Sequence, residues 1–307
     1  MPICERDPWR DQFFENVSCP DDVLIPTDDP DCWNWYPERR WVYDKLKIAE
    51  SQGLDCGPHG VMPKQFPVFS KPMVNLKGMG IGSRVIASAE EFDRHYQPGH
   101  MWVTLLTGAH VSTDCAIENG RVAWSRHATG EAWIEGTFKH WTIHAARQPR
   151  LESYLSDWVG NHMRGYTGMM NFETIGGRII ETHLRFADQW CDIYGAGWVE
   201  ALVRLYEKGT WQFDDSHRRD GFSIPLFARH GKAFRHPSPM VQAEIRGLPH
   251  ITSLQITFHE RKDPAGHPMP PGGFRLGIVN ATDLAAGQAA RRALARAFPE
   301  GGVMLPD

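Results

Sequence analysis

The sequence predicts an α+β fold built on antiparallel sheets, for three reasons. Residues 101–106, 111–117 and 121–124 have the composition of successive strands, and Asn119-Gly120 is a hairpin signal between the last two. Residues 151–164 place apolar side chains on one face of a helix. The chain has 307 residues, of which 41% are hydrophobic and 23% are charged, enough for one sizeable core or two smaller lobes.

Charge and composition exclude several classes of protein. A net charge of -4 and a pI near 6.4 give no general attraction to nucleic acid or to an anionic membrane, so an anionic ligand needs a local basic pocket. No apolar run approaches the length of a membrane span, and residues 1–7 lack the features of a signal peptide, which predicts a cytoplasmic protein. Six cysteines without a CxxC pair argue against a zinc module and a disulfide framework.

The N-terminal third begins with an arm, residues 1–37, which is rich in Pro, Asp and Trp and which we expect to wrap around the body. Residues 38–52 have apolar positions at helical spacing and Gly53 is a natural stop, so Lys45 is expected on a helix. The other elements expected in this third are strands at 23–26, 66–71 and 85–86, a glycine loop at 78–83, and a short helix capped by Ser88 and Glu91.

The second half is expected to contain a two-stranded ribbon over residues 171–186, a helix over residues 197–208 and a tail that begins near Phe222. The tail elements expected are strands at 223–227, 252–259 and 274–279 and a helix at 283–297. Eight tryptophans fall in the middle of the chain, where core packing explains them and stacking on a base or sugar is the alternative.

The ribbon places acidic and imidazole side chains beside an arginine. Because side chains alternate along a strand, Glu181, His183 and Arg185 share one face, and the residues between them share the other. A hard cation that bridges phosphate oxygens binds carboxylates, and an arginine stabilises the charge of a transferring phosphoryl group. The pattern predicts a site for Mg²⁺ and phosphate, and the plain alternative is a solvated hairpin with cross-strand ion pairs.

The partner carboxylate on the first strand of the ribbon is expected to be Glu173, with Asn171 as the alternate. The turn between the strands decides whether either residue joins the site. A two-residue Gly176-Gly177 loop points Glu173 away from Glu181, whereas a three-residue loop with a left-handed glycine places Asn171 and Glu173 on the same face as Glu181. We expect the three-residue loop.

Lys71 ends an apolar strand just before the glycine loop, so its ammonium group can reach triphosphate oxygens while backbone N–H groups of the loop close over them. The loop lacks the Gly-Lys-Ser/Thr ending of a Walker A loop. A strand rather than a long helix is expected after it, which argues against a Rossmann turn. The alternative is that the glycines form a hairpin turn and Lys71 is solvated.

The order of these parts resembles the ATP-grasp superfamily, with a helical Lys45, a strand-end Lys71, a glycine loop and a carboxylate-bearing ribbon. The resemblance spans about residues 40–210, and more loosely the tail. It implies two lobes, built on antiparallel sheets, that clasp a nucleotide. The implied division is an N-terminal arm at 1–37, a small lobe with the glycine flap at 38–106, a large lobe with the metal site at 107–221 and a C-terminal α/β lobe at 222–307.

The resemblance also assigns roles to residues. Lys45 and Lys71 would bind the phosphates of ATP, and Lys71 and Arg185 would act in catalysis, with Arg185 stabilising the phosphoryl group. The implied metal ligands are Glu173, Glu181 and His183. The other implied nucleotide contacts are the flap residues Gly78, Gly80, Gly82 and Ser83 and the adenine segment Trp102, Val103, Thr104 and Leu105, where backbone groups read the base.

His183 departs from the motif Glu-x-Asn-x-Arg of the superfamily, which stands here as Glu181-Thr182-His183-Leu184-Arg185. Imidazole is a poorer ligand for Mg²⁺ than a carboxamide oxygen. His183 therefore hydrogen-bonds a phosphate, favours a softer metal such as Mn²⁺, or marks weakened catalysis.

The sequence leaves two interpretations open for each of four further residues. His110 and Asp114 share a strand face, so they line the nucleotide or substrate cleft or are ordinary surface positions. His140 and His144 flank Trp141 in a segment that faces substrate or plays a structural role.

The arm is shorter than the N-terminal α/β domain of ATP-grasp ligases, so the tail, a second copy of the chain or a partner protein would complete the substrate pocket, unless the body holds the substrate alone. Arg275 would anchor an anionic substrate there, or form a surface ion pair. Small-molecule carboxylate and amine substrates are expected, without nucleic acid or membrane.

The activity implied by the resemblance is that of an ATP- and Mg²⁺-dependent carboxylate–amine ligase acting through an acyl phosphate. The alternatives are an ATP-grasp phosphotransferase, which stops at the phosphorylated product, and a nucleotide-binding protein with weakened catalysis.

Overall fold

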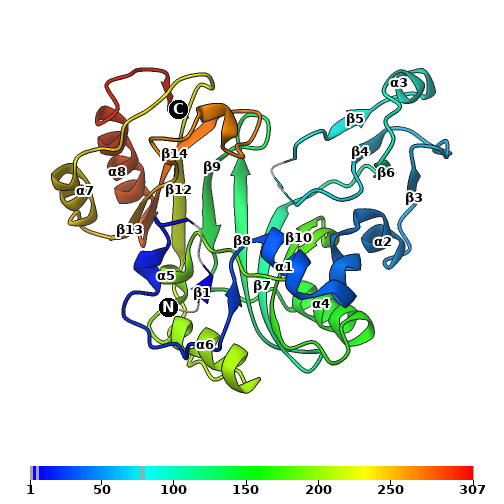
Figure 1. Ribbon diagram of the computed structural model, residues 1–307. Helices are drawn as coiled ribbons and strands as arrows, with labels where there is room; N and C mark the ends of the chain where they lie inside the picture. The colour runs from blue at the N-terminus through cyan, green and yellow to red at the C-terminus, as the bar shows by residue number, and fades with distance from the viewer. Residues whose placement is uncertain (1–2, 5–6, 77, 79, 307) are drawn as a thin grey trace.

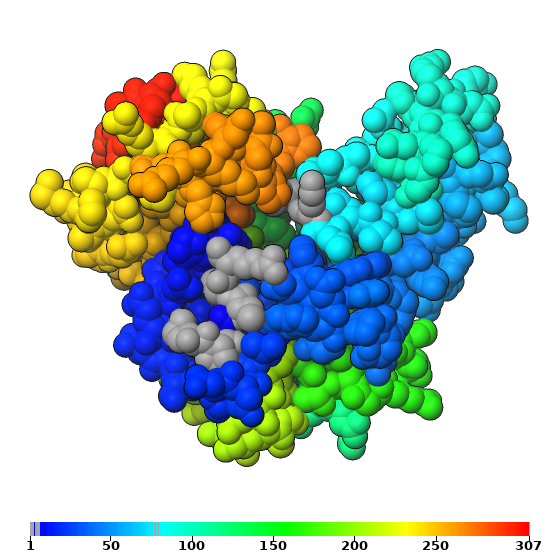
Figure 2. All heavy atoms as spheres, viewed as in Figure 1, coloured from blue at the N-terminus to red at the C-terminus, as the bar shows by residue number. Residues whose placement is uncertain are grey.

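The computed structural model describes residues 3–4, 7–76, 78 and 80–306 and contains two antiparallel sheets, one in each of two lobes (Figure 1). The predicted α+β fold with two lobes on antiparallel sheets is confirmed. Figure 2 shows a notch in the surface between the small lobe, in cyan, and the C-terminal lobe, in orange. No helix in the described ranges has the length and apolar character needed to cross a bilayer.

The small lobe is a four-stranded sheet with a helix on one face. Its strands, in spatial order, are β3 (Cys56–Pro58), β6 (His100–Thr104), β4 (Val68–Pro72) and β5 (Arg84–Ile86). Helix α3 (Ala89–Arg94) buries Phe92 against Val68, Ile86 and Trp102. As predicted, the Ser88 side chain caps α3 by accepting a hydrogen bond from the backbone N–H of Glu91, at 3.2 Å.

The helix expected over residues 38–52 is divided in two. A 3-10 helix, η2 (Pro37–Tyr43), ends at Asp44, and helix α2 (Lys45–Glu50) begins there. The Asp44 carboxylate accepts hydrogen bonds from the first backbone N–H groups of α2, so it starts a new helix where apolar spacing alone suggested a continuous one. Lys45 is nevertheless on a helix, as predicted.

Among the described residues, the large sheet has nine strands in the order β11-β10-β7-β8-β9-β12-β14-β13, with β15 paired to β12. Their bounds are β7 (His110–Glu118), β8 (Arg121–Ala132), β9 (Phe138–Ile143), β10 (Gly168–Ile175), β11 (Arg178–His183), β12 (Gly221–Ala228), β13 (Ile251–Ile256), β14 (Phe274–Ala281) and β15 (Val303–Met304). Because β12 pairs with β9, the tail and the large lobe share one continuous sheet. Strand β9 was not expected from the sequence.

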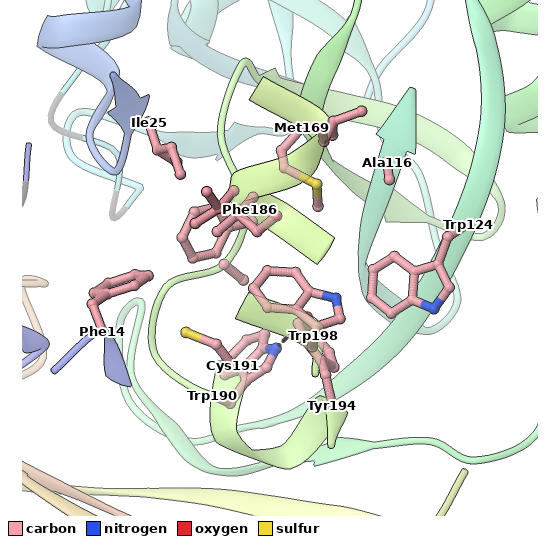
Figure 3. Close-up of a cluster of buried hydrophobic side chains, with 14 of the residues drawn as sticks. Phe14, Ile25, Ala116, Trp124, Met169, Phe186, Trp190, Cys191, Tyr194 and Trp198 are labelled. Atoms are coloured by element: carbon pink, nitrogen blue, oxygen red, sulfur yellow. Dashed lines mark hydrogen bonds between the residues drawn. The ribbon is translucent and has the colours of Figure 1, made fainter. Parts of the chain in front are cut away.

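Different elements cover the two faces of the large sheet (Figure 1). Helix α4 (Pro149–His162) packs through Leu155, Trp158 and Val159 on one face. The other face is covered by α5 (Cys191–Tyr194), α6 (Trp198–Lys208) and the arm, as Figure 3 shows for the rings around Trp198. The buried tryptophans of this cluster confirm core packing as their role. The remaining elements are β1 (Ile3–Cys4), β2 (Ile25–Pro26), η1 (Asp11–Phe13), α1 (Asp29–Trp35), α7 (Pro239–Arg246), η3 (Pro264–Gly266) and α8 (Leu284–Arg296).

The turn of the ribbon, formed by β10 and β11, differs from the expected one. Ile175 pairs with Arg178, so the loop is the two-residue Gly176-Gly177 and the prediction of a three-residue loop was wrong. Both glycines have positive φ, 57° and 78°, as a tight hairpin turn of this length requires.

A bulge nevertheless brings Glu173 opposite Glu181. Thr174 pairs with Ile179 and Glu173 pairs with Glu181, which leaves Ile180 as an extra residue on β11. One extra residue reverses the alternation of side chains, so the two glutamates share a face in spite of the short loop. The expected juxtaposition is present, but its cause is the bulge.

The hairpin turn generates a stability prediction. A Cβ at Gly176 would overlap the carbonyl oxygen of Thr107, whereas a Cβ at Gly177 has nothing within 4 Å. We expect Gly177→Ala to cost about 1 kcal/mol through left-handed backbone strain, and Gly176→Ala to cost about 3 kcal/mol because overlap is added to strain. Urea denaturation followed by tryptophan fluorescence measures both costs, and equal costs would contradict the close approach.

Candidate functional site

One face of the large sheet carries two rows of polar side chains across β11, β10 and β7. Residues that pair across antiparallel strands lie on the same face, so the register defines the rows. The rows are Glu181, Glu173 and Ser112, and His183, Asn171 and Asp114. The first row lies nearer to the ribbon turn, and the second lies nearer to the core below α5 and α6.

Two lysines reach the first row from the side of the small lobe. Lys45 Nζ lies 2.9 Å from Glu181 Oε1, and Lys71 Nζ donates a hydrogen bond to the carbonyl oxygen of Ile180, at 2.8 Å. Lys71 is only 7% exposed, which excludes a solvated side chain. The predicted convergence of Lys45, Lys71 and Glu181 across the two lobes is therefore present, and the bulge residue supplies the acceptor for Lys71.

Burial disfavours the charged form of the Lys71 ammonium group. Its pKa is lowered to about 8, first by burial and then by the charge of Lys45, which together outweigh the opposing effect of Glu181 and Glu173. A polyanionic ligand placed here would favour the charged form of Lys71. The geometry is thus suited to phosphate oxygens.

Glu173 is paired with a histidine on the neighbouring strand. His110 Nε2 lies 3.2 Å from Glu173 Oε2. Burial acts to raise the pKa of Glu173, but the hydrogen bond and charge of His110 outweigh burial and hold this pKa well below its usual range. Burial acts to lower the pKa of His110, and Glu173 reverses that effect, so the pKa of His110 is raised. His110 therefore adjoins the carboxylate row, and its role in lining a nucleotide or substrate cleft stays a prediction.

Asp29, a residue of the arm, contacts the second row through His183. His183 Nδ1 lies 2.9 Å from Asp29 Oδ2, and the Arg185 guanidinium lies 3.0 Å from the same oxygen. Asp29 is 5% exposed. Burial acts to raise its pKa, but Arg185 and His183 hold it well below the usual range. Sequence reasoning missed Asp29, because no local pattern indicates a contact with a residue 154 positions away.

Glu173 and Glu181 fit a Mg²⁺ ion that arrives with phosphate. Their side chains are 30% and 19% exposed, and Mg²⁺ is commonly held by one or two carboxylates together with substrate phosphates. Over the described ranges, no group of three or more His, Cys, Asp or Glu side chains could hold a metal ion by itself. The role of His183 as a metal ligand stays a prediction, and its Nδ1 is hydrogen-bonded to Asp29.

The glycine flap follows β4. Gly78, Gly80 and Gly82 all have positive φ, and the Ser83 backbone N–H donates to the Gly80 carbonyl oxygen at 3.1 Å. Leu76 packs against the core on the α4 side of the large sheet, so the loop begins in contact with the large lobe. Met79, which belongs to the predicted loop, and Lys77, which precedes it, lie outside the described residues.

The predicted adenine segment falls mostly inside a central strand. Trp102 and Val103 pair with β3 on one side of β6 and with β4 on the other, and the backbone N–H of Thr104 donates to Asp55. The backbone groups of these residues therefore take part in pairing within the small-lobe sheet and in the hydrogen bond to Asp55. Leu105 follows the end of β6, so it is the part of the predicted segment beyond the strand.

Other predicted residues have structural partners. Asp114 is buried and accepts hydrogen bonds from Asn171, the Ala187 N–H and Tyr194. His144 contacts Thr129 at 2.7 Å. Arg275 is half-buried, and its Nε is buried without a hydrogen-bond partner among the described residues. Burial lowers the pKa of Arg275 to about 10.

No family model matches the sequence, and no curated protein matches it. Solved structures do match it. An L-amino acid ligase from Bacillus licheniformis has a TM-score of 0.63 and 11% identity over 97% of this chain and 84% of that one. Phosphoribosylamine–glycine ligase from Thermotoga maritima has a TM-score of 0.62 and 13% identity, covering 96% of this chain and 87% of the other.

N5-carboxyaminoimidazole ribonucleotide synthetase from Thermus thermophilus has a TM-score of 0.59 and 14% identity, over 95% of this chain and 85% of that chain. Identities this low show a shared fold and nothing finer. These structures are ATP-grasp enzymes, so the chain has the ATP-grasp fold.

The buried ammonium of Lys71 predicts a pH dependence. Because its pKa falls from 10.5 in the unfolded chain to about 8 in the fold, the unfolded chain binds more protons between these values and stability rises with pH there. Relative to Lys71→Met, the wild-type free energy of unfolding should rise by roughly 2 to 4 kcal/mol from pH 8 to pH 10.5. Urea denaturation across this range measures it, and a constant difference would argue against a lowered pKa.

The contact between the arm and the ribbon predicts a large effect of Asp29→Asn. The substitution removes the carboxylate that contacts the half-buried Arg185 and the buried His183, and breaking a buried ion pair costs about 3 kcal/mol. The exposed Asp22→Asn is the matched control and should change stability by less than about 0.5 kcal/mol. Equal stability of the two variants in urea denaturation would show that Asp29 does not hold the ribbon.

Proposed function

We propose that this chain, which has the ATP-grasp fold, is a ligase that uses ATP to join a carboxylic acid to an amine through an acyl phosphate. The observation that carries the proposal is the meeting of Lys45 and Lys71 with the carboxylate row of the ribbon across the two lobes. The ligases among the similar solved structures support the general kind of reaction.

In this proposal the two lysines hold the triphosphate. Lys71 is buried beside Lys45, and the negative charge of a phosphate chain would stabilise the charged form of Lys71. The flap after β4 has glycines at positive φ, which allow backbone N–H groups to approach phosphate oxygens closely. These contacts orient the terminal phosphoryl group toward the carboxylate row.

Glu173 and Glu181 are the residues that would hold Mg²⁺ together with phosphate oxygens. When bound, the ion would neutralise charge on the phosphates. Because the two glutamates come from adjacent, paired strands, the sheet holds the distance between them without help from a loop. His110 orients Glu173, and Lys45 orients Glu181.

The reaction then has two steps. A carboxylate oxygen of the acid attacks the terminal phosphorus, the bond from that phosphorus to the bridging oxygen breaks, and ADP leaves. The amine nitrogen next attacks the acyl carbon, the bond from carbon to the phosphate oxygen breaks, and phosphate leaves as the nitrogen loses its proton. Arg185, which Asp29 keeps in place, is proposed to stabilise charge on the phosphoryl group.

A nucleotide-binding protein with weakened catalysis is the second candidate. The observation that favours it is His183, which stands where the superfamily has Asn and whose ring nitrogen is held by Asp29. Thermal stabilisation by ATP and Mg²⁺, without phosphate release for any pair of acid and amine, would distinguish this candidate from the ligase. A phosphotransferase is distinguished by its product, because it consumes one organic substrate per ATP rather than two.

Glu181→Gln tests the proposed site. Loss of the carboxylate should reduce ATP turnover at least a hundredfold, with an unchanged circular dichroism spectrum. Glu131→Gln is the matched control, because Glu131 pairs with Lys139 at the same 2.9 Å but is half exposed. Phosphate release is measured over a panel of acids and amines. Full activity of Glu181→Gln, or equal loss in the control, would contradict the assignment.

A further inference from the structure

Beyond the carboxylate row, the same face of the large sheet carries three rings, Phe138, Trp141 and His110, which we call the aromatic wall. The ring centroids of Phe138 and Trp141 are 4.4 Å apart, and His110 lies 5.7 Å from Phe138 and 5.5 Å from Trp141. All three side chains are half-buried, in contrast to the fully buried Trp198 of the core. They therefore present partly open ring surface.

Gly130 and a register shift beside it make room for the rings of this wall. Gly130 on β8 pairs with Trp141 on β9, and the register shifts beside it, so that Phe138 and Trp141 lie on one face. A Cβ at Gly130 would lie 2.5 Å from Phe138 Cδ1 and 3.2 Å from Trp141 Cε2. Only glycine lets both rings lie directly over the strand.

The position of the wall relative to the lysines indicates what it contacts. Across the sheet the order is β11 with Glu181 and the two lysines, then β10 with Glu173, then β7 with His110, then β8 and β9. Strands in a sheet are about 4.8 Å apart, so β9 lies roughly 14 Å from β10. The lysines and the wall are thus on opposite sides of the carboxylates.

In the proposed function, this order places the nucleotide and the phosphoryl acceptor on different sides of the carboxylates. A nucleotide held by Lys45 and Lys71 approaches the carboxylates from the β11 side, so the group that attacks its terminal phosphorus must come from the β7 side, where the wall stands. Figure 1 shows the upper ends of β8 and β9 between the small lobe and the C-terminal lobe, beside the notch in Figure 2. The wall therefore lies where the acceptor has to bind.

We propose that the phosphoryl acceptor is a carboxylic acid bearing an aromatic ring, which packs on Phe138 and Trp141 while its carboxylate lies beside His110. Offset or edge-to-face packing of aromatic rings is favourable beyond the area buried. His110 lies between the two rings and the carboxylate row, 5.7 Å and 5.5 Å from the ring centroids of Phe138 and Trp141 and 3.2 Å from Glu173, so a carboxylate beside it lies next to the proposed site of phosphoryl transfer. This inference deepens the proposed function and rests on it.

The test compares two acids that differ only in the ring, 3-phenylpropionate and 3-cyclohexylpropionate, by calorimetric titration in the presence of ADP and Mg²⁺. The wild type should bind the aromatic acid about fivefold to tenfold more tightly, and Phe138→Leu should remove most of that preference. Phe222→Leu is the matched control, because Phe222 pairs with Thr142 and so lies on the opposite face from Trp141. It should keep the preference.

Equal affinity of the wild type for the two acids, absence of binding by both, or an unchanged preference in Phe138→Leu would overturn the inference. Its failure can be told from failure of the proposed function. If ADP with Mg²⁺ stabilises the protein and only aliphatic acids stimulate phosphate release, the ligase proposal stands and the aromatic acid is excluded. If neither ADP nor ATP binds, the ligase proposal fails whatever affinity the protein has for the acids.

Discussion

The bulge at Ile180 is the constraint on which the geometry of the site depends. A two-residue hairpin loop with regular pairing would place Glu173 and Glu181 on opposite faces of the sheet. The extra residue on β11 restores the shared face, and its carbonyl oxygen is also the acceptor that Lys71 reaches from the small lobe. One local irregularity thus aligns the carboxylates and connects the two lobes. The hairpin glycines are what permit the tight turn beside it.

The arm contributes to the site as well as to the core. Phe14 and Ile25 are fully buried against the large lobe, and a few residues further on Asp29 reaches His183 and Arg185. Burying a cationic group without a partner is costly, so this carboxylate stabilises the buried His183 and the half-buried Arg185 at the end of the ribbon. It also gives a physical account of the unusual histidine. An asparagine at that position would offer Asp29 a neutral partner, whereas a protonated imidazole offers it a charge.

The continuous large sheet arranges the parts of the site in a line. The lysines, the carboxylates and the aromatic wall follow one another across β11, β10, β7, β8 and β9, and the tail strands extend the same sheet. Hydrogen-bonded strands keep these spacings nearly constant. The small lobe contacts the line at one end, through α2 and Lys71. In the proposed function, this arrangement places the nucleotide and the phosphoryl acceptor on different sides of the carboxylates, and the proposed substrate class follows from that separation.

The sequence alone determined the features that neighbouring residues decide: Lys45 on a helix, Lys71 at a strand end, the glycine loop, and the shared face of Glu181 and its neighbours. Periodicity and capping act over a few residues, so they can be read along the chain. Only the tertiary structure decided the bulge that aligns Glu173, the contact of Asp29 with His183 and the wall formed by Phe138, Trp141 and His110. Each of these depends on strand register or on packing between segments far apart in sequence, and no local pattern encodes which distant backbone or side chain will be the partner.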